Sequence, residues 1–263
     1  MTAAHAGFLA GAGLLAGFVN GVVGTGSLIS FPALMAAGYG ALTANVTNTL
    51  SIIPGYVGNA IGYRRELSGQ KARMAAFGAA TVVGSAGGTA ALLAFPASDF
   101  RKVVPYLILV SACLMAGQKR IASWVASRRS ARKVVGEAAG LVAAPREHTV
   151  PLLVAMAACG AYAGYFGAGV SVILLATLGA TVADSLQRLN ALRSVLTFTG
   201  NVLAGIVFAF AASVAWSAVA VMAPASLVGG WLGSTVARRI PDALLRWTVV
   251  AFAGVVGLVL LVG

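Results

Sequence analysis

The sequence predicts an all-α polytopic membrane protein, and three observations support this: its composition, the length of its apolar segments and a repeated glycine pattern. Of the 263 residues, 59% are hydrophobic and only 9% are charged, and the mean hydropathy is +0.92. A water-soluble domain has roughly 25% charged residues, so most of this surface is expected to face lipid. Apolar segments long enough to cross a hydrocarbon core of about 30 Å recur along nearly the whole chain. We therefore expect a multi-pass protein of the cell inner membrane with no separate soluble domain.

The glycine pattern occurs twice and divides the chain into two related halves. The segment GFVNGVVGTG at residues 17–26 matches GAYAGYFGAG at residues 160–169, with an offset of 143 residues. Farther along, the offset becomes 145, where Gly84, Gly88, Pro96 and Arg101 match Gly229, Gly233, Pro241 and Arg246. Self-similarity of this kind indicates an internal duplication.

Each half is expected to hold a glycine-broken helical hairpin followed by three transmembrane helices. The first repeat covers residues 1–118, a basic cytoplasmic linker covers 119–149, and the second repeat covers 150–263. The linker is long enough for a surface helix in the membrane interface. The expected helical segments are 6–38, 43–63, 72–95 and 101–118 in the first half, and 150–180, 185–210, 213–237 and 243–262 in the second.

The basic residues favour an inverted arrangement of the two repeats. If both broken segments cross the membrane fully, the two sides carry eleven and seven of the 18 Lys and Arg residues. If each segment instead enters and returns to its starting side, the second half is inverted and sixteen of the 18 fall on one side. Positive charge marks the cytoplasmic side, so we expect periplasmic termini and a cytoplasmic linker. The competing interpretation is that the glycines only allow ordinary spanning helices to pack closely.

Several classes of site and partner are not expected. The formal net charge is +12, but the basic residues lie in short interruptions between apolar runs, so nucleic acid is not an expected partner. Cys113 and Cys159 lack the spacing of metal ligands, and His5 and His148 are the only histidines. We expect no metal, no cofactor and no catalytic residues, and therefore no enzyme.

The two glycine-rich breaks are candidate binding segments, because irregular backbone inside a membrane must be buried in protein or line water. Glycine permits tight turns and removes side-chain bulk, so backbone amides can face a cavity. A helix that starts after a break points its free N–H groups and its positive dipole end into that space, which suits an anion. The candidate substrate-binding residues at the breaks are Gly24, Thr25, Gly26, Ser27, Gly167, Ala168 and Gly169.

The helix that follows each break adds polar side chains to the candidate site, namely Asn48, Asn190, Arg193 and Asn201. For a single neutral side chain, hydrogen bonding between helices is the competing role. Arg193 lies about nine residues beyond Asp184, or roughly 14 Å along a helix. There its guanidinium needs a partner that an oxyanion can provide, unless the helix starts later and the side chain reaches the interface. The six acidic residues all fall at expected helix ends or in loops, which favours an anionic substrate over a carboxylate proton relay.

The chain resembles the sulfite exporter TauE/SafE family in the segment GFVNGVVGTGSLISFPALMAAGYGALTANVTNTLSI and its repeat GAYAGYFGAGVSVILLATLG. The segments VGSAGGTAA and VGGWLGSTVARRIPDALLRW reinforce the resemblance, which covers nearly the whole chain. It implies transport of sulfite or organosulfonates, commonly as export from bacteria. Members often have a richer glycine run at the first break, which Thr25 and Ser27 interrupt here, so the ligand is left open.

These observations together predict a secondary transporter that moves a small sulfur-containing anion by alternating access. A passive anion channel or uniporter is the main alternative, since no coupling residue is visible in the sequence. A membrane-embedded enzyme or an assembly factor is a more distant one. The expected partners are the small anionic substrate and the lipid bilayer, and a homodimer is left open.

Overall fold

The computed structural model describes residues 2–138, 149–236 and 242–262, and all regular structure in these ranges is α-helical. The prediction of an all-α fold is confirmed over these ranges, which contain ten helices and no strand. The helices are α1 (Ala3–Val22), α2 (Ser27–Ala36), α3 (Ala41–Gly62), α4 (Lys71–Ala94), α5 (Ala97–Ala138), α6 (Val150–Tyr165), α7 (Val170–Thr181), α8 (Leu186–Ala211), α9 (Trp216–Val236) and α10 (Asp242–Val262).

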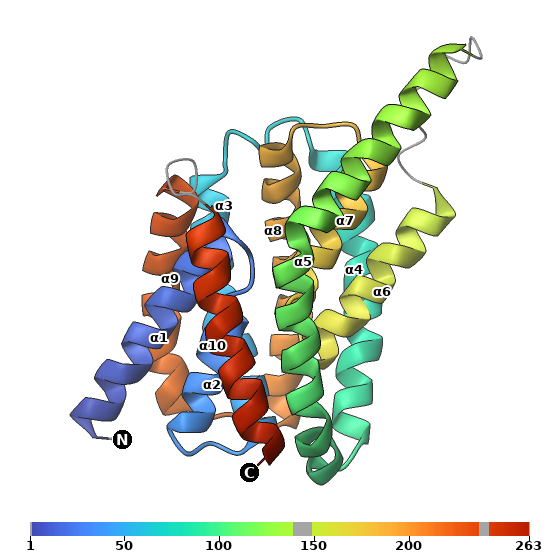
Figure 1. The fold of residues 1–263 in the computed structure, drawn as a ribbon. Helices are drawn as coiled ribbons and strands as arrows, with labels where there is room; N and C mark the ends of the chain where they lie inside the picture. The colour runs from blue at the N-terminus through green and yellow to red at the C-terminus, as the bar shows by residue number, and fades with distance from the viewer. Residues whose placement is uncertain (1, 139–148, 237–241, 263) are drawn as a thin grey trace.

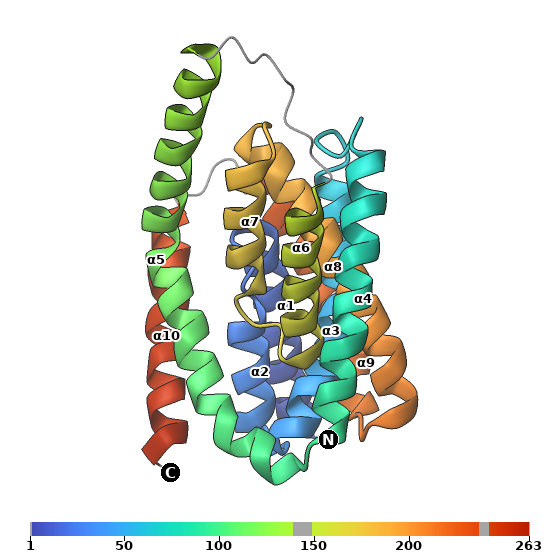
Figure 2. The ribbon, with the colours of Figure 1, turned by 90° about the vertical axis from the view of Figure 1, so that its right-hand side faces the viewer.

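Each glycine-broken segment forms a hairpin of two helices that turns inside the bundle (Figures 1 and 2). In the view of Figure 1, α1 rises from the lower end and α2 returns to it, whereas α6 descends from the upper end and α7 returns there. The helices α2 and α7 have 10 and 12 residues, or about 15–18 Å, which is roughly half the thickness of a hydrocarbon core. The hairpins therefore reach the middle of the bundle from opposite ends.

The remaining helices run along the bundle in alternating directions. In Figure 1, α3, α5 and α9 run upward and α4, α8 and α10 run downward, so both chain termini lie at the lower end. Five helical segments among the described residues are long and apolar enough to cross a membrane: Ala3–Val22, Lys71–Ala94, Ala97–Gln118, Leu186–Ala211 and Trp216–Val236. Large apolar side chains also cover the outside of the bundle, as at Phe210, which is 90% exposed.

The helix α5 differs from the sequence-based expectation. It continues to Ala138, beyond the expected end at residue 118, as one helix of 42 residues. The basic segment 119–138 contains no proline and is rich in Ala, Arg and Lys, so nothing in it ends the helix. The first part of the expected linker is therefore a continuation of a transmembrane helix, and the part at 139–148 lies outside the described residues.

Helices from different halves pack backbone to backbone through glycine. The helix α1 lies against α9, where a Cβ added at Gly17 would overlap the backbone of Ser226. The helix α4 lies against α6 in the same way, where a Cβ at Gly84 would overlap the backbone of Ala157. Small residues allow such close approach in a membrane, where apolar burial gives little drive for helix association. The central helices α3 and α8 also contact each other, so the two halves also meet in the centre of the bundle.

Candidate functional site

The first break joins α1 to α2 through Val23, Gly24, Thr25 and Gly26. Gly24 has a φ of 88°, in the left-handed region that residues with a Cβ seldom adopt. The N–H of Gly26 donates to Asn20 Oδ1 at 2.7 Å, so an asparagine in the last turn of α1 holds the start of α2. The break is thus a fixed turn inside the bundle, and both Gly24 and Asn20 are part of it.

Arg193 lies inside the protein beside this break. Its helix α8 begins at Leu186 after a cap in which the Ser185 hydroxyl accepts from the N–H of Arg188 at 3.3 Å. Arg193 follows seven residues later, or about 10 Å along the helix axis, and is only 1% exposed. Of the two positions that the sequence left open, the structure places the guanidinium in the interior rather than at the interface.

The guanidinium of Arg193 bonds to backbone carbonyls at the end of α1. Its Nη1 donates to Val23 O at 2.6 Å and its Nη2 donates to Asn20 O at 3.4 Å. The C-terminal end of a helix carries partial negative charge, so this contact compensates part of the buried positive charge. The Nε–H has no hydrogen-bond partner among the described residues. One donor of a buried cation is therefore available to a ligand.

The first break also meets the start of α7 from the other hairpin. A Cβ added at Gly24 would overlap Arg193 Nη1 and come within 2.7 Å of Ser171 Cβ. Ser171 is the second residue of α7, whose N-terminus carries the positive end of its dipole. The two hairpins and α8 therefore converge at Gly24, with the guanidinium between them.

The second break is held by neutral groups. Gly167 and Gly169 both have a φ of 79°, and the carbonyl of Ala168 lies between them. That carbonyl accepts from Ser111 Oγ at 2.8 Å and from the Tyr162 hydroxyl at 2.9 Å. Among the described residues, no charged side chain bonds to this break. Like the first break it contains a left-handed glycine, but it lacks a cation, and Gly169 is left-handed where the corresponding Gly26 has a φ of −59°.

Aromatic side chains pack beside the second break. Phe166, within the break, meets Phe31 of α2 edge-on, with ring centroids 5.5 Å apart. Phe100 of α5 packs against Phe166 and against Tyr165, at 6.3 Å and 5.8 Å. Edge-to-face contacts of this kind fill space with apolar surface. The second break therefore lies in a more apolar setting than the first.

The structure brings some of the other predicted residues to the first break and places others elsewhere. Asn190 reaches the break indirectly, because its Nδ2 donates to the Tyr63 hydroxyl at 3.2 Å and that hydroxyl donates to Gly21 O at 2.7 Å. Asn48 Oδ1 accepts from Ser30 of α2 at 2.5 Å, within its own half. Asn201 donates to the backbone of its own helix, at Thr197 O, 2.7 Å away.

Two further predicted residues at the first break, Thr25 and Ser27, are buried in the protein. The Thr25 hydroxyl points to the sulfur of Met115 on α5 at 3.2 Å, and Ser27 is buried at the start of α2. Sequence reasoning missed Asn20, Ser111 and Tyr162. Asn20 is a solitary amide in an apolar helix, which is a signal that could have been used. Ser111 and Tyr162 carry no such signal, because their shared partner is a distant backbone carbonyl.

The chain was compared with known proteins. The profile of the family described as Sulfite exporter TauE/SafE matches residues 9–260. This chain belongs to the sulfite exporter TauE/SafE family. It is 26% identical over 253 residues to the "Probable membrane transporter protein YfcA" of Escherichia coli (strain K12), which covers 94% of this chain and 86% of the relative. It is 24% identical over 238 residues to the "Probable membrane transporter protein" of Haemophilus influenzae, covering 90% and 87%. No solved structure was found to match it.

These matches support a multi-pass membrane transporter, and they agree with the resemblance seen in the sequence. Among the residues that the structure describes, no group of three His, Cys, Asp or Glu side chains is placed to hold a metal ion. Among the described residues of this family member, an ion-pair network near the ends of the helices joins the two halves.

Asp184, in the loop before α8, accepts from Arg73 of α4 at 2.6 Å and pairs with Arg188 at 2.9 Å. The Arg188 side chain also donates to Ser68 O at 3.1 Å. Partial burial raises the pKa of Asp184, but hydrogen bonds from Arg188 and Arg73 outweigh it and hold the pKa below its usual value. This network ties the loop after α3 to the start of α8 at the upper end of Figure 1.

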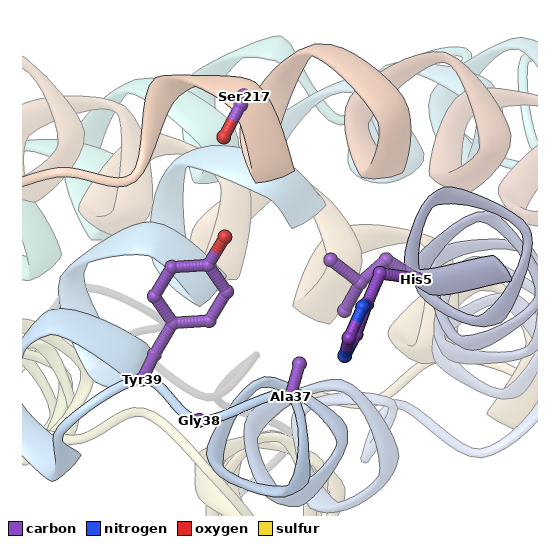
Figure 3. A pocket seen from close by; sticks show the side chains of 6 residues that line it. His5, Ala37, Gly38, Tyr39 and Ser217 are labelled. Carbon is purple, nitrogen blue, oxygen red and sulfur yellow. The ribbon is translucent and has the colours of Figure 1, made fainter. Parts of the chain in front are cut away.

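A pocket of 270 Å³ lies at the opposite end of this TauE/SafE protein, where α1 starts, α2 ends and α9 begins (Figure 3). Its lining includes His5, Tyr39 and Ser217, and the hydroxyl of Tyr39 points into the space between them. It is open to the surface beside the N-terminal turn of α1, and Arg193 does not line it. The candidate site at the first break and this pocket are therefore separate features.

Proposed function

We propose that this protein is a secondary transporter that exports a small sulfur-containing anion, sulfite or an organosulfonate, across the bacterial inner membrane by alternating access. The observation that carries the proposal is Arg193, a buried cation at the first break with an unpartnered Nε–H. The sulfur-containing substrate and the direction of transport come from the description of the family to which the chain belongs.

A buried guanidinium in a membrane is costly unless a counter-charge or water compensates it. At Arg193 the protein supplies only backbone carbonyls, at Val23 and Asn20. An oxyanion would complete the set of bonds, because the free Nε–H and the second hydrogen of the neighbouring Nη can face two oxygens of a sulfite or sulfonate group. The need for such a partner favours an anion over a cation or a neutral solute.

We further propose that the two halves are inverted repeats of one unit, in the recurrent architecture of secondary transporters. The opposite entry of the hairpins α1–α2 and α6–α7 supports this reading. It predicts periplasmic termini and a cytoplasmic segment 119–149, which puts sixteen of the 18 basic residues inside. A cysteine introduced near residue 130 should be labelled only after the inner membrane is opened, and labelling in intact cells would contradict the orientation.

Alternating access agrees with the burial of Arg193 in this structure, since the site is closed to both sides. A passive channel or uniporter is the competing mechanism. In proteoliposomes a carrier should show saturable uptake that is accelerated by unlabelled anion on the opposite side, which a channel should not. Linear uptake without such counterflow would favour the channel.

The substrate class is tested by thermal stabilisation of the purified protein with sulfite, sulfate, thiosulfate, sulfoacetate and taurine, using carboxylates as controls. A ligand that binds the folded state at 100 times its Kd adds about 2.7 kcal/mol of apparent stability. We expect stabilisation by at least one sulfur-containing anion and its loss in Arg193→Ala. If no sulfur-containing anion stabilises the protein, the proposed substrate is wrong.

A further inference from the structure

The first break offers a ligand one full positive charge and no full negative charge. Arg193 is the ionised side chain that bonds to this break, and its protein partners are the carbonyls of Val23 and Asn20. The phenol of Tyr63, which bonds to Gly21 O, is neutral in its ordinary state. Among the described acidic side chains, Asp184 is engaged with Arg73 and Arg188, Asp99 lies in the first turn of α5, and Glu66 is buried in the loop after α3. No carboxylate within the described residues pairs with Arg193.

The partial charges of the helix ends around the first break have opposite signs and largely cancel. The C-terminal ends of α1 and α6 carry partial negative charge, and the N-terminal ends of α2 and α7 carry partial positive charge of similar size. The exposed carbonyls are also occupied, since Tyr165 O accepts from Asn45 at 3.1 Å and Ala168 O accepts from two hydroxyls. The electrostatic balance of the site therefore rests on the guanidinium alone.

Unpartnered donors lie around this single charge. Besides the Nε–H of Arg193, the buried Nδ2 of Asn20 has no hydrogen-bond partner among the described residues. The side-chain amide of Asn59 lies near the same region, since a Cβ added at Gly21 would lie 2.9 Å from its Oδ1, and both its Nδ2 donor and its Oδ1 acceptor are unpartnered among the described residues. Buried donors without acceptors are uncommon, and they fit a ligand that brings several acceptor oxygens.

We infer that the first break binds a monoanion with three acceptor oxygens, such as an alkanesulfonate or hydrogen sulfite, and discriminates against dianions of similar size. This inference rests on the proposed anion transport and names the charge that the site accepts. One negative charge is balanced by Arg193, and its oxygens take the free donors of Arg193 and Asn20. A dianion leaves one negative charge uncompensated in a region of low dielectric, where unpaired charge is strongly disfavoured.

The direct test compares methanesulfonate with sulfate, two tetrahedral anions of similar size that carry one and two charges. Titration of each into the purified full-length protein, followed by thermal stabilisation or calorimetry, should give a Kd for sulfate at least about tenfold weaker, which is about 1.4 kcal/mol. Sulfate that binds as tightly as methanesulfonate overturns the inference but leaves anion transport standing. Failure of both anions and of sulfite to bind overturns the proposed function as well.

Asn20→Asp provides a matched variant that leaves the turn intact. Its Oδ1 can still accept from the N–H of Gly26, while its carboxylate supplies the counter-charge that the inference assigns to the ligand. We expect methanesulfonate binding to weaken at least tenfold, with a melting temperature in the absence of ligand equal to or above that of the parent. Asn20→Ala adds no charge but removes both the free donor and the acceptor of the Gly26 N–H, so it should lower the melting temperature while weakening binding only a few-fold. Equal affinity of Asn20→Asp and the parent for methanesulfonate overturns the inference.

Discussion

The two glycine breaks share one left-handed glycine and differ in the side chains that bond to them. Both contain a glycine with a left-handed φ, of 88° at Gly24 and 79° at Gly167, and both lie at the tip of a hairpin inside the bundle. A guanidinium bonds to the first break, whereas two hydroxyls bond to the second. Asn48 occupies the position of the first half that corresponds to Arg193 at the offset of 145 residues. The duplicated scaffold therefore carries its buried charge at one tip only, and a second charge is not needed to form the turn.

Removing that charge should give the largest difference between the two halves. Arg193→Ala is expected to lower anion affinity by roughly 10–100-fold, because a hydrogen bond to a charged group contributes about 1.5–3 kcal/mol. Asn48→Ala, the matched change in the first half, should lower it only a few-fold. Arg193→Lys should fall between, because it keeps the charge and loses the fork. Kd values for the anion that stabilises the parent test this order.

Membrane abundance and detergent stability of the same variants must be measured, because Arg193→Ala also removes donors from Val23 O and Asn20 O. If Arg193→Ala binds and transports the anion like the parent, Arg193 is a structural residue. The anion site would then rest on the backbone amides of the breaks.

A pair of alanine substitutions compares the two turns directly. Gly24→Ala and Gly167→Ala place a Cβ at a similar φ, so each should cost roughly 1–2 kcal/mol of stability through backbone strain. At Gly24 the new Cβ also overlaps Arg193, while at Gly167 the nearest atom is Ala163 O at 3.1 Å. We expect loss of anion binding in Gly24→Ala and near-parental binding in Gly167→Ala. Valine at either position should lower transport more than membrane insertion, because its β-branched side chain adds crowding.

The neutral ligands of the second break should have a smaller effect, limited to stability. Either Ser111→Ala or Tyr162→Phe leaves one hydroxyl on Ala168 O, so each alone should cost about 1 kcal/mol or less. The double variant leaves a buried carbonyl without these donors and should cost more than the sum of the two single changes. Melting temperatures of the four proteins in detergent measure this coupling. A change of anion affinity in the double variant would contradict the assignment of binding to the first break.

The smallest effect is expected at Asp184. Its substitution tests whether a charge at the end of the bundle affects anion binding as the charge at the first break is expected to. Its folded pKa is lowered, so its stabilising contribution is fully present above the ordinary pKa of an aspartate, about 3.9, and is lost as the pH falls through the folded value. The Asp184→Asn variant should therefore melt slightly below the parent from pH 8 to pH 5, and the difference should shrink only in stronger acid. Partly exposed ion pairs contribute about 1 kcal/mol or less. Anion affinity at neutral pH should not change.

Much of the fold could be predicted from sequence, because the apolar character, the length of each helix and the glycine breaks depend on residues that are close together in the chain. The apolar runs and the two breaks follow from residue type alone, and the helices lie close to their expected ranges. The apolar span Ala97–Gln118 ends where it was expected, but the continuation of α5 to Ala138 was not predicted, because the change from apolar to basic residues marks a change of surroundings rather than a break in the backbone. Helix continuity depends on propensity, which this segment retains.

The candidate site could be predicted only in outline. The sequence left Arg193 either in the interior or at the interface, and the start of α8 at Leu186 places it about two turns into the helix, where it is buried. The partners of Arg193 lie 170 and 173 residues away in the sequence, and Tyr162 and Ser111 converge from different helices. Such contacts depend on how helices of one half pack on those of the other. Helical periodicity in a single sequence contains no record of that pairing.

The glycine contacts between α1 and α9, and between α4 and α6, have a consequence for how the molecule can move. Each hairpin packs against a helix from the opposite half. The backbones lie so close at the glycines that no side chains separate them. The helices that pack most closely together are therefore not neighbours in the sequence. A rocking motion would divide the bundle between the body of α1 and α9 and the body of α4 and α6, so every stroke would move pieces of both repeats together. If the protein moves in this way, each moving body contains helices from both halves, and neither half alone contains a complete moving body.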